Sequence, residues 1–155
     1  MELLPLRTDD LGELLTVQPA AYVTEAQLYA DPHLPPLVQT LDDLHSKFGE
    51  VDGIVLRTSG RLVGSVRFRT DGDLLHIGRL AVVPDQQGRG LGTRLLAAAE
   101  AATPAARATL FTGHLSAANL RLYEWCGYVE ERREVVRPGL TLVHLGKTCV
   151  RRDQV

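Results

Sequence analysis

The sequence predicts a single α/β (α+β) domain in which a mixed sheet of about seven strands is flanked by helices on both faces. Strand-like and helix-like hydrophobic segments alternate along the chain, which is the order that such a sheet requires. Of the 155 residues, 45% are hydrophobic, and charged residues are spread along the length, as in a chain with a sizeable core. No internal repeat, low-complexity tract or linker divides the chain, so residues 1–155 are expected to form one domain.

The first half of the chain is predicted to form a strand, a helical region and a hairpin. Thr8 can cap the first helix, and Asp9 and Asp10 suit the positive end of its dipole. Ser59-Gly60 is a typical hairpin turn between two hydrophobic runs. The predicted elements are a strand over residues 1–7, a helical region from residue 9 that the prolines of "DPHLPP" interrupt and that resumes over residues 40–48, and a hairpin over residues 53–69.

The second half alternates strands and helices and ends in another hairpin. Ser116 is a suitable cap for the last helix, and Gly127 a suitable stop. Pro138-Gly139 is expected to turn the final hairpin. The predicted elements are a strand over residues 74–83, a helix over 93–102, a strand over 108–114, a helix over 116–126, and strands over 128–137 and 140–146.

Composition and charge exclude several classes of protein. The formal net charge is -2 and the pI is near 6.2, with no Lys/Arg cluster, so a nucleic-acid partner is not expected. The start of the chain lacks a signal-peptide pattern and no apolar run is long enough to span a bilayer, so we expect a cytoplasmic protein with no membrane partner. Cys126 and Cys149 have no metal-site spacing, so we expect reduced thiols and no metal.

The stretch "PDQQGRGLGTRLL", residues 84–96, places Gly88, Gly90 and Gly92 at alternate positions directly before an apolar helix. Glycine is a poor helix former, and bare backbone N–H groups converging at a helix N-terminus form a site for a pyrophosphate. The loop lacks the Gly-Lys-Ser/Thr ending of a P-loop, and Thr93 stands where the dinucleotide fingerprint needs glycine. A plain glycine-rich turn is the alternative.

Two motifs, in a fixed order along the chain, resemble those of a known family. In "LAVVPDQQGRGLGTRLL" the pattern is Gln87-x-x-Gly90-x-Gly92. In "SAANLRLYEWCGY" the matching residues are Asn119, Tyr123, Gly127 and Tyr128. They resemble the acetyl-CoA-binding loop and the N-x-x-x-Y helix of the GCN5-related N-acetyltransferases (GNAT). The resemblance covers residues 53–146, and residues 1–48 by the order of their elements.

The resemblance implies acetyl-CoA as co-substrate and no metal. The glycine-loop backbone would bind the CoA pyrophosphate, with Arg89 adding its charge, and the preceding strand would bind the pantetheine arm through its main chain. An amide at Val82 or Val83 could polarise the thioester carbonyl. For Asn119, a purely structural role in the first turn of its helix is the alternative. The implied cofactor-binding residues are Leu80, Ala81, Val82, Val83, Gln87, Gly88, Arg89, Gly90, Leu91, Gly92, Thr93, Asn119 and Tyr123.

Direct transfer from a thioester to an amine needs a base and an acid. The family often has a glutamate on the strand before the glycine loop, whereas this chain has His76 there. A histidine can accept a proton near neutral pH, so His76 is the predicted base, with a half-buried strand residue as the alternative. The weaker candidates for the base are His114, Glu25 and Asp31. Tyr123 is the predicted acid for the leaving thiolate, and packing of its ring is the alternative.

The family usually forms one wall of the acceptor site from the segment after the first strand. Here that segment is "AAYVTEAQLYADPHLPPL", and its aromatic and acidic side chains suit a cationic amine. The alternative is a purely structural role, in which the tyrosines pack a helix against the sheet. The predicted acceptor-binding residues are Tyr22, Glu25, Tyr29, Asp31 and His114.

The predicted function is therefore N-acetyl transfer from acetyl-CoA to a primary amine, by direct transfer in a ternary complex. The expected partner is a small-molecule amine, and a homodimer is left open. An amino acid, a polyamine, an aminoglycoside and a protein N-terminus all remain open as acceptors. The alternatives are a non-catalytic acyl-CoA-binding sensor and, more remotely, a structural partner domain that binds no CoA.

Overall fold

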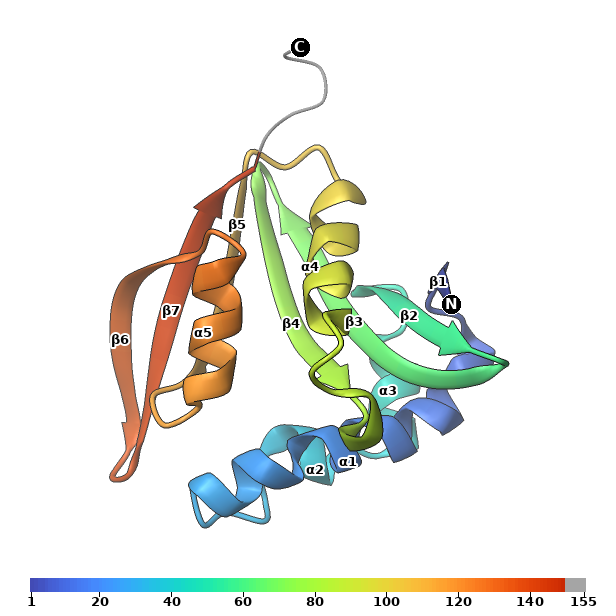
Figure 1. Ribbon diagram of the computed structural model, residues 1–155, viewed down its shortest axis with the longest axis horizontal. Helices are drawn as coiled ribbons and strands as arrows, with labels where there is room; N and C mark the ends of the chain where they lie inside the picture. Colours follow the sequence, from blue (N-terminus) through green and yellow to red (C-terminus); the bar gives the residue numbers. More distant parts are fainter. Residues whose placement is uncertain (150–155) are drawn as a thin grey trace.

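The computed structural model describes residues 1–149, which form one seven-stranded mixed sheet with helices packed on it (Figure 1). The strands are β1 (Glu2–Pro5), β2 (Asp52–Thr58), β3 (Arg61–Asp71), β4 (Leu74–Val82), β5 (Arg107–Gly113), β6 (Val129–Arg137) and β7 (Leu140–Thr148). The helices are α1 (Leu11–Leu28), α2 (Pro35–Val38), α3 (Leu41–Lys47), α4 (Leu91–Ala101) and α5 (Ala117–Trp125), with short 3-10 turns η1 (Thr8–Asp10) and η2 (Pro84–Gln86). The predicted fold class is confirmed. The last residues of the predicted domain, 150–155, lie outside the described residues.

The sheet order is β1-β2-β3-β4-β5-β7-β6, and its two halves meet at one short parallel pairing. Residues 74–76 of β4 pair with residues 107–109 of β5, and no further pair joins these two strands in the described chain. Beyond this point the strands diverge, so that the sheet opens like a V toward α1 (Figure 1). The backbone groups along the inner edges of the V therefore lack strand partners.

A β-bulge lies in β4 just after the point where the strands separate. Arg67 pairs with Gly78 and Ser65 with Ala81, so two residues of β4, Arg79 and Leu80, lie opposite one residue of β3. Arg79 has a φ of 50°, which is rare for a residue with a side chain. A bulge of this kind bends its strand and changes the direction of the side chains within it.

The core lies between the sheet and the helices on its two faces. Residues 62–68 of β3 are all buried, whereas a strand with one solvated face would alternate. One helix face of α4 packs on β2, β3 and β4 through Leu91, Leu95, Leu96 and Ala99. The helix α1 packs against β3 and β4, and α5 covers the other half of the sheet in Figure 1.

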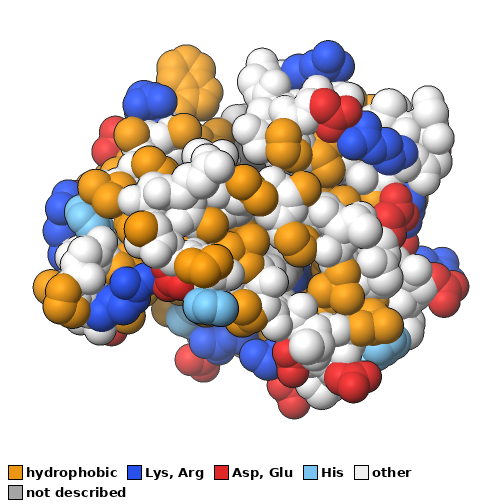
Figure 2. Space-filling model, turned by 90° about the horizontal axis from the view of Figure 1, so that it is seen from below, with side chains coloured by type: hydrophobic (Ala, Val, Ile, Leu, Met, Phe, Trp, Pro, Cys, Tyr) orange, Lys and Arg blue, Asp and Glu red, His pale blue; other side chains and the backbone are white. Residues whose placement is uncertain are grey.

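The helices α1 and α2 lie at the open end of the split sheet. Seen from that side, hydrophobic side chains spread across the middle of the surface and most acidic ones lie toward its edge (Figure 2). Val23 and Leu28 of α1 and Val38 of α2 are exposed. The helix α1 therefore both covers the opening and presents an apolar outer surface there.

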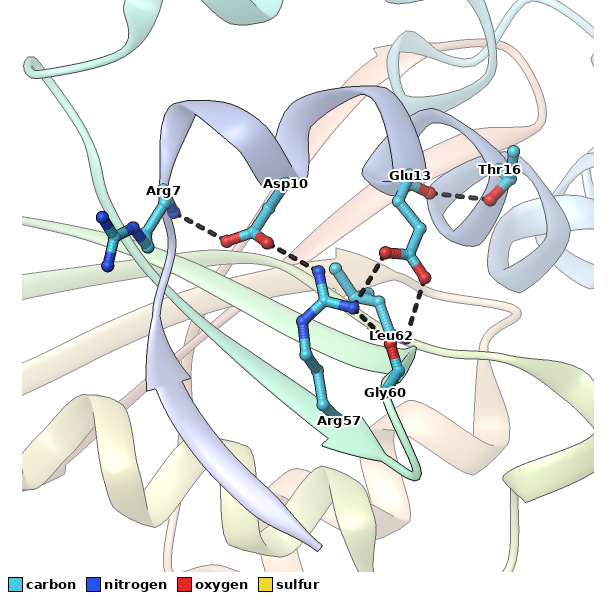
Figure 3. Close-up of polar contacts among 7 residues, drawn as sticks. All are labelled: Arg7, Asp10, Glu13, Thr16, Arg57, Gly60 and Leu62. Atoms are coloured by element: carbon cyan, nitrogen blue, oxygen red, sulfur yellow. Dashed lines mark hydrogen bonds and ion pairs between the residues drawn. The ribbon is translucent and has the colours of Figure 1, made fainter.

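The start of α1 is fixed to the β2–β3 hairpin by an ion-pair network (Figure 3). The Arg57 guanidinium donates to Asp10 at 2.6 Å and to Glu13 at 2.9 Å, and Glu13 also accepts the Leu62 amide at 2.9 Å. Hydrogen bonds to these carboxylates raise the pKa of Arg57. Because the first turns are anchored, the residues further along α1 have a defined place over the split.

Local structure confirms most of the predicted turns and corrects two details. Ser59 and Gly60 both have positive φ, 51° and 80°, as the predicted hairpin turn requires. Gly127, with a φ of 94°, lies just after the end of α5 as expected. Thr8 does not cap α1, because it lies inside η1 and Asp10 occupies the cap position instead. Pro35, in the stretch predicted to interrupt the helical region, begins the short helix α2.

Candidate functional site

The glycine loop between β4 and α4 needs its three glycines for two different reasons. Gly88 and Gly90 have φ values of 78° and 77°, a left-handed conformation that favours glycine, and a Cβ at either position would meet nothing within 4 Å. Gly92 instead packs closely on α5, since a Cβ there would lie 3.1 Å from the Leu122 side chain. The loop therefore has open space at Gly88 and Gly90, whereas at Gly92 it is tightly packed against α5.

The N-terminus of α4 is uncapped and faces a cavity of about 400 Å³. Gly90 is the N-cap residue, no side chain caps the helix, and Arg94 is the first residue whose amide donates in the helical pattern, to the Gly90 oxygen at 3.2 Å. The preceding amides have no helical partner, and the dipole makes this end positive. The cavity is bounded by residues 86–88 and 90–93, by residues 80–82 of β4, and by residues of α1 and α5. It suits a phosphate-containing ligand.

The inner edge of β4 forms a second wall of this first cavity. The Tyr22 hydroxyl donates to the Leu80 oxygen at 3.1 Å, and the Gln87 side-chain amide donates to the Val82 oxygen at 3.0 Å. The Val83 amide points the other way, to the Val63 oxygen of β3 at 2.9 Å. Because the N–H and C=O of one strand residue point to the same edge, the Val82 amide faces the cleft and the Val83 amide does not. Of the two predicted oxyanion donors, Val82 is thus the one that the cleft can reach.

A second cavity of about 340 Å³ lies deeper in the V, between β4 and β5. It is lined by Tyr29 of the α1 C-terminus, Tyr123 of α5 and residues of β5, α2 and the β6–β7 hairpin. The first and second cavities share Tyr22, Glu25, Leu80 and Asn119. The two cavities therefore adjoin each other at these four residues, which we call the common wall.

Glu25 stands at the common wall and is held from α5. The Ser116 hydroxyl donates to its carboxylate, and the Asn119 amide donates to Glu25 at 3.3 Å and to Thr112 at 3.2 Å. The Tyr29 hydroxyl shares a 2.8 Å hydrogen bond with Ser116. Among the residues that line the two cavities in the described chain, Glu25 is the single carboxylate.

Tyr123 is buried in the second cavity with its hydroxyl free of partners. No hydrogen bond joins that hydroxyl to any residue within 1–149, and the ring packs edge-on against Tyr128 at a centroid distance of 6.2 Å. Burial, together with the negative charge of Glu25, raises the pKa of Tyr123 above its usual range. The group is therefore a neutral phenol with a free donor.

Residues 38–149 match the family model described as "Acetyltransferase (GNAT) domain". The chain belongs to the GNAT family. The curated protein YqkA of Bacillus subtilis is 31% identical over 84 residues, a match that covers 54% of this chain and 24% of that protein, so the chain matches about a quarter of its relative.

Solved GNAT structures share the whole fold. The ribosomal-protein-S18-alanine N-acetyltransferase of Escherichia coli has a TM-score of 0.77 and 20% identity, with 99% of this chain and 97% of that chain covered. The acetyltransferase yncA of Salmonella typhimurium, described with its cofactor acetyl-CoA, has a TM-score of 0.76 and 14% identity, with 98% and 95% covered. Because the sequence identities are 20% and 14%, these similarities show a shared fold and nothing further.

Three residues predicted as bases or acceptor contacts of this GNAT chain lie away from the two cavities, and the predicted CoA contacts Val83 and Arg89 line neither cavity. His76 sits in the paired part of β4 and lines a third cavity, and burial and the neighbouring Arg69 lower its pKa. Asp31 forms an ion pair of 2.5 Å with Arg137. His114 accepts the Thr141 amide at 3.1 Å through Nδ1. The structure does not bring any of them to the common wall, whereas it places Tyr22, Glu25, Tyr29 and Tyr123 around the second cavity.

Sequence reasoning missed Arg79, which lines both the second and the third cavity. Its position depends on the bulge in β4, and the only local signal is the preceding Gly78 in an otherwise hydrophobic strand. Residues 1–149 contain no cluster of three His, Cys, Asp or Glu side chains that could hold a metal ion. In the same range, no helix has both the length and the apolar character needed to cross a membrane.

Proposed function

We propose that this protein is an acetyl-CoA-dependent N-acetyltransferase that transfers the acetyl group directly to the primary amine of a small-molecule acceptor in a ternary complex. The observation that carries the proposal is the common wall of the two cavities, formed by Tyr22, Glu25, Leu80 and Asn119. A donor and an acceptor bound side by side would meet there, as direct transfer requires.

The first cavity has the features that CoA needs. The positive φ of Gly88 and Gly90 and the uncapped N-terminus of α4 suit a pyrophosphate, and Arg89 lies exposed beside them. The unpaired inner edge of β4 suits an extended amide-containing arm, which can add to a strand edge by hydrogen bonds. Acetyl-CoA would supply the acetyl thioester, and the chain's own groups would supply the proton transfers.

Glu25 is proposed as the base and Tyr123 as the donor to the leaving group. The acceptor arrives as an ammonium, Glu25 accepts the proton that it loses, and the amine nitrogen then forms a bond to the thioester carbonyl carbon. The Val82 amide stabilises the oxyanion until the C–S bond breaks, and the second proton of the amine nitrogen passes to the leaving sulfur, so that CoA departs as the thiol. The Tyr123 hydroxyl hydrogen-bonds to the thiolate, and its raised pKa keeps it in the protonated form that can donate.

The proposal is tested by binding and by thiol release. Acetyl-CoA at a hundred times its Kd is expected to add about 2.7 kcal/mol to the free energy of unfolding, measured as a rise in Tm. A panel of primary amines should then release CoA thiol at a rate that depends on amine concentration. Failure of acetyl-CoA to stabilise the protein would overturn the proposal. Stabilisation without transfer to any amine would instead support the non-catalytic acyl-CoA-binding alternative.

A further inference from the structure

The third cavity, of about 540 Å³, lies on the sheet between β3 and β6 and is lined by basic side chains. No aspartate or glutamate is among its described lining residues. We call it the cationic cavity. Its basic residues are Lys47, Arg67, Arg69, Arg79 and Arg132, together with His76 and His144.

These cations lack the carboxylate partners that other arginines of the chain have. Within residues 1–149, none of the lysine or arginine side chains of the cationic cavity forms an ion pair, and of its two histidines only His144 does, with Glu134 at 3.1 Å. In contrast, five arginines elsewhere each contact a carboxylate: Arg57, Arg61, Arg107, Arg133 and Arg137. Five of the nine lysine and arginine side chains that form no ion pair within residues 1–149 therefore lie around this one cavity, and the other four are Arg7, Arg89, Arg94 and Arg121.

Arg67 is the least expected of them, because only 9% of its surface is exposed. Its hydrogen bonds go to the neutral side-chain oxygens of Gln18 and Gln39, and its Nε has no partner in the described chain. Burial and the nearby charge of Arg79 lower its pKa to about 10. A buried cation without a counter-ion is costly, so such a group is usually completed by an anion.

Arg79 connects the cationic cavity to the second cavity. Arg79 lines both, and the two cavities also share Ile77, Gly78, Leu110 and Phe111. Its charge acts on Tyr22 at the common wall and on Arg67 in the cationic cavity. One molecule could therefore place an amine near Glu25 and an acidic group near Arg79 and Arg67.

We propose that the cationic cavity binds an anionic group of the acceptor, so that the acceptor is an amine that also carries a carboxylate or a phosphate. The proposal rests on the proposed acetyltransferase function and narrows its substrate class. Arginines bind both kinds of oxyanion by charge-assisted hydrogen bonds. The amine and the acid of such an acceptor are recognised by groups of opposite charge, Glu25 on one side and Arg79 on the other.

The test compares amines that differ only in the acidic group. With acetyl-CoA saturating, kcat/KM is measured for β-alanine against ethylamine, γ-aminobutyrate against propylamine, and phosphoethanolamine against ethanolamine. The acid-bearing member of at least one pair is expected to be preferred tenfold or more, and the pair concerned tells carboxylate from phosphate. Equal or faster transfer to the neutral amine in every pair would overturn the inference while leaving the acetyltransferase function standing.

Variants locate the preference in the cationic cavity. Arg79→Asn removes the charge and keeps a residue that tolerates positive φ, and it should reduce the acid preference by roughly tenfold to a hundredfold. Arg121→Gln, an exposed position on α5 outside the cavity, is the control for the same charge change. Arg132→Gln on the exposed strand β6 repeats the test should Arg79→Asn fail to fold. A preference that survives both cavity variants contradicts the proposal.

A binding measurement separates this inference from the proposed function. If the protein binds acetyl-CoA but acetylates no amine, calorimetry is used to measure the binding of inorganic phosphate and of glutarate to the protein saturated with CoA. Binding that Arg79→Asn weakens and Arg121→Gln leaves unchanged supports an anion site in the cationic cavity. The absence of any binding by either anion overturns it.

Discussion

The Asn119 side-chain amide donates a 3.3 Å hydrogen bond to Glu25, and this contact joins α5 to α1 across the open end of the split sheet. Both residues line both cavities of the proposed site. Asn119, the motif residue on α5, is therefore connected to the proposed site by its hydrogen bond to Glu25 of α1. Because α1 is anchored at its start by Arg57, the same contact also fixes the wall that the acceptor would meet.

Glu25→Gln tests the proposed base. Glutamine can still hydrogen-bond to Ser116 and Asn119, so stability and acetyl-CoA binding should remain near normal. Turnover should fall by about a hundredfold or more, because the ammonium loses its proton acceptor. The deficit should shrink as the pH approaches the pKa of the amine, where solution supplies free amine. A pH profile of kcat/KM identical to that of the unmodified protein would remove Glu25 from the base role.

His76→Gln tests the competing base. Burial and the neighbouring Arg69 lower the pKa of His76 and so favour its neutral form, which an uncharged glutamine replaces with little change in charge. Since His76 lies outside the two cavities of the proposed site, we expect unchanged kcat and an unchanged pH profile. A large loss of turnover that recovers at high pH would instead make His76 the base and argue against Glu25.

The motifs that could be predicted from the sequence are those in which the local backbone conformation has one main structural or binding role. Alternating glycines before a helix predict an anion site, and the positive φ of Gly88 and Gly90 agrees with that interpretation. Hairpin turns such as Ser59-Gly60 are equally local. These features need no knowledge of how distant segments pack.

The arrangement of the site could not be predicted in the same way. Glu25 is 91 residues from Ser116 in sequence, and only the packing of α1 over the split brings them together. His76 is on the predicted strand, but the split begins just after it, a position that depends on strand pairing. Asp31 has the right charge for an amine site, yet Arg137 from the β6–β7 hairpin pairs with it. Such partners are set by tertiary structure.

Gly90→Asp tests the first cavity as the pyrophosphate site. A Cβ at this position meets no atom within 4 Å, and aspartate tolerates positive φ better than most residues, so the domain should stay folded. The added negative charge opposes the phosphates, and acetyl-CoA binding should be abolished in calorimetry. Gly139→Asp is the matched control, because it has a φ of 88° and open space in the final hairpin. Unchanged affinity in Gly90→Asp would refute the assignment of the loop.

Gly113→Ala tests the closure of α1 on α5. An added Cβ would lie 1.9 Å from the Tyr29 hydroxyl, which is held by Ser116 and by the Leu115 amide at 3.0 Å. The side chain must move, so we expect a loss of about 1–3 kcal/mol in the free energy of unfolding and a higher KM for the acceptor. Gly12→Ala, in open space on α1, should not destabilise the protein. Equal stability of the two variants in urea denaturation would contradict the expected contact.

Tyr123→Phe tests the donor to the leaving thiolate and separates chemistry from packing. Phenylalanine keeps the buried ring and its contact with Tyr128, and the lost hydroxyl has no protein partner within residues 1–149, so stability should change little. Acetyl-CoA binding should also be near normal, because Tyr123 lines the second cavity and not the first. Turnover should fall by about a hundredfold, since the departing thiolate loses its hydrogen bond. The measurement is single-turnover thiol release, with Tyr128→Phe as the control that removes a buried hydroxyl outside both cavities. If Tyr123→Phe reacted at the unmodified rate with chemistry rate-limiting, the hydroxyl would have no part in the transfer and the ring would serve packing alone.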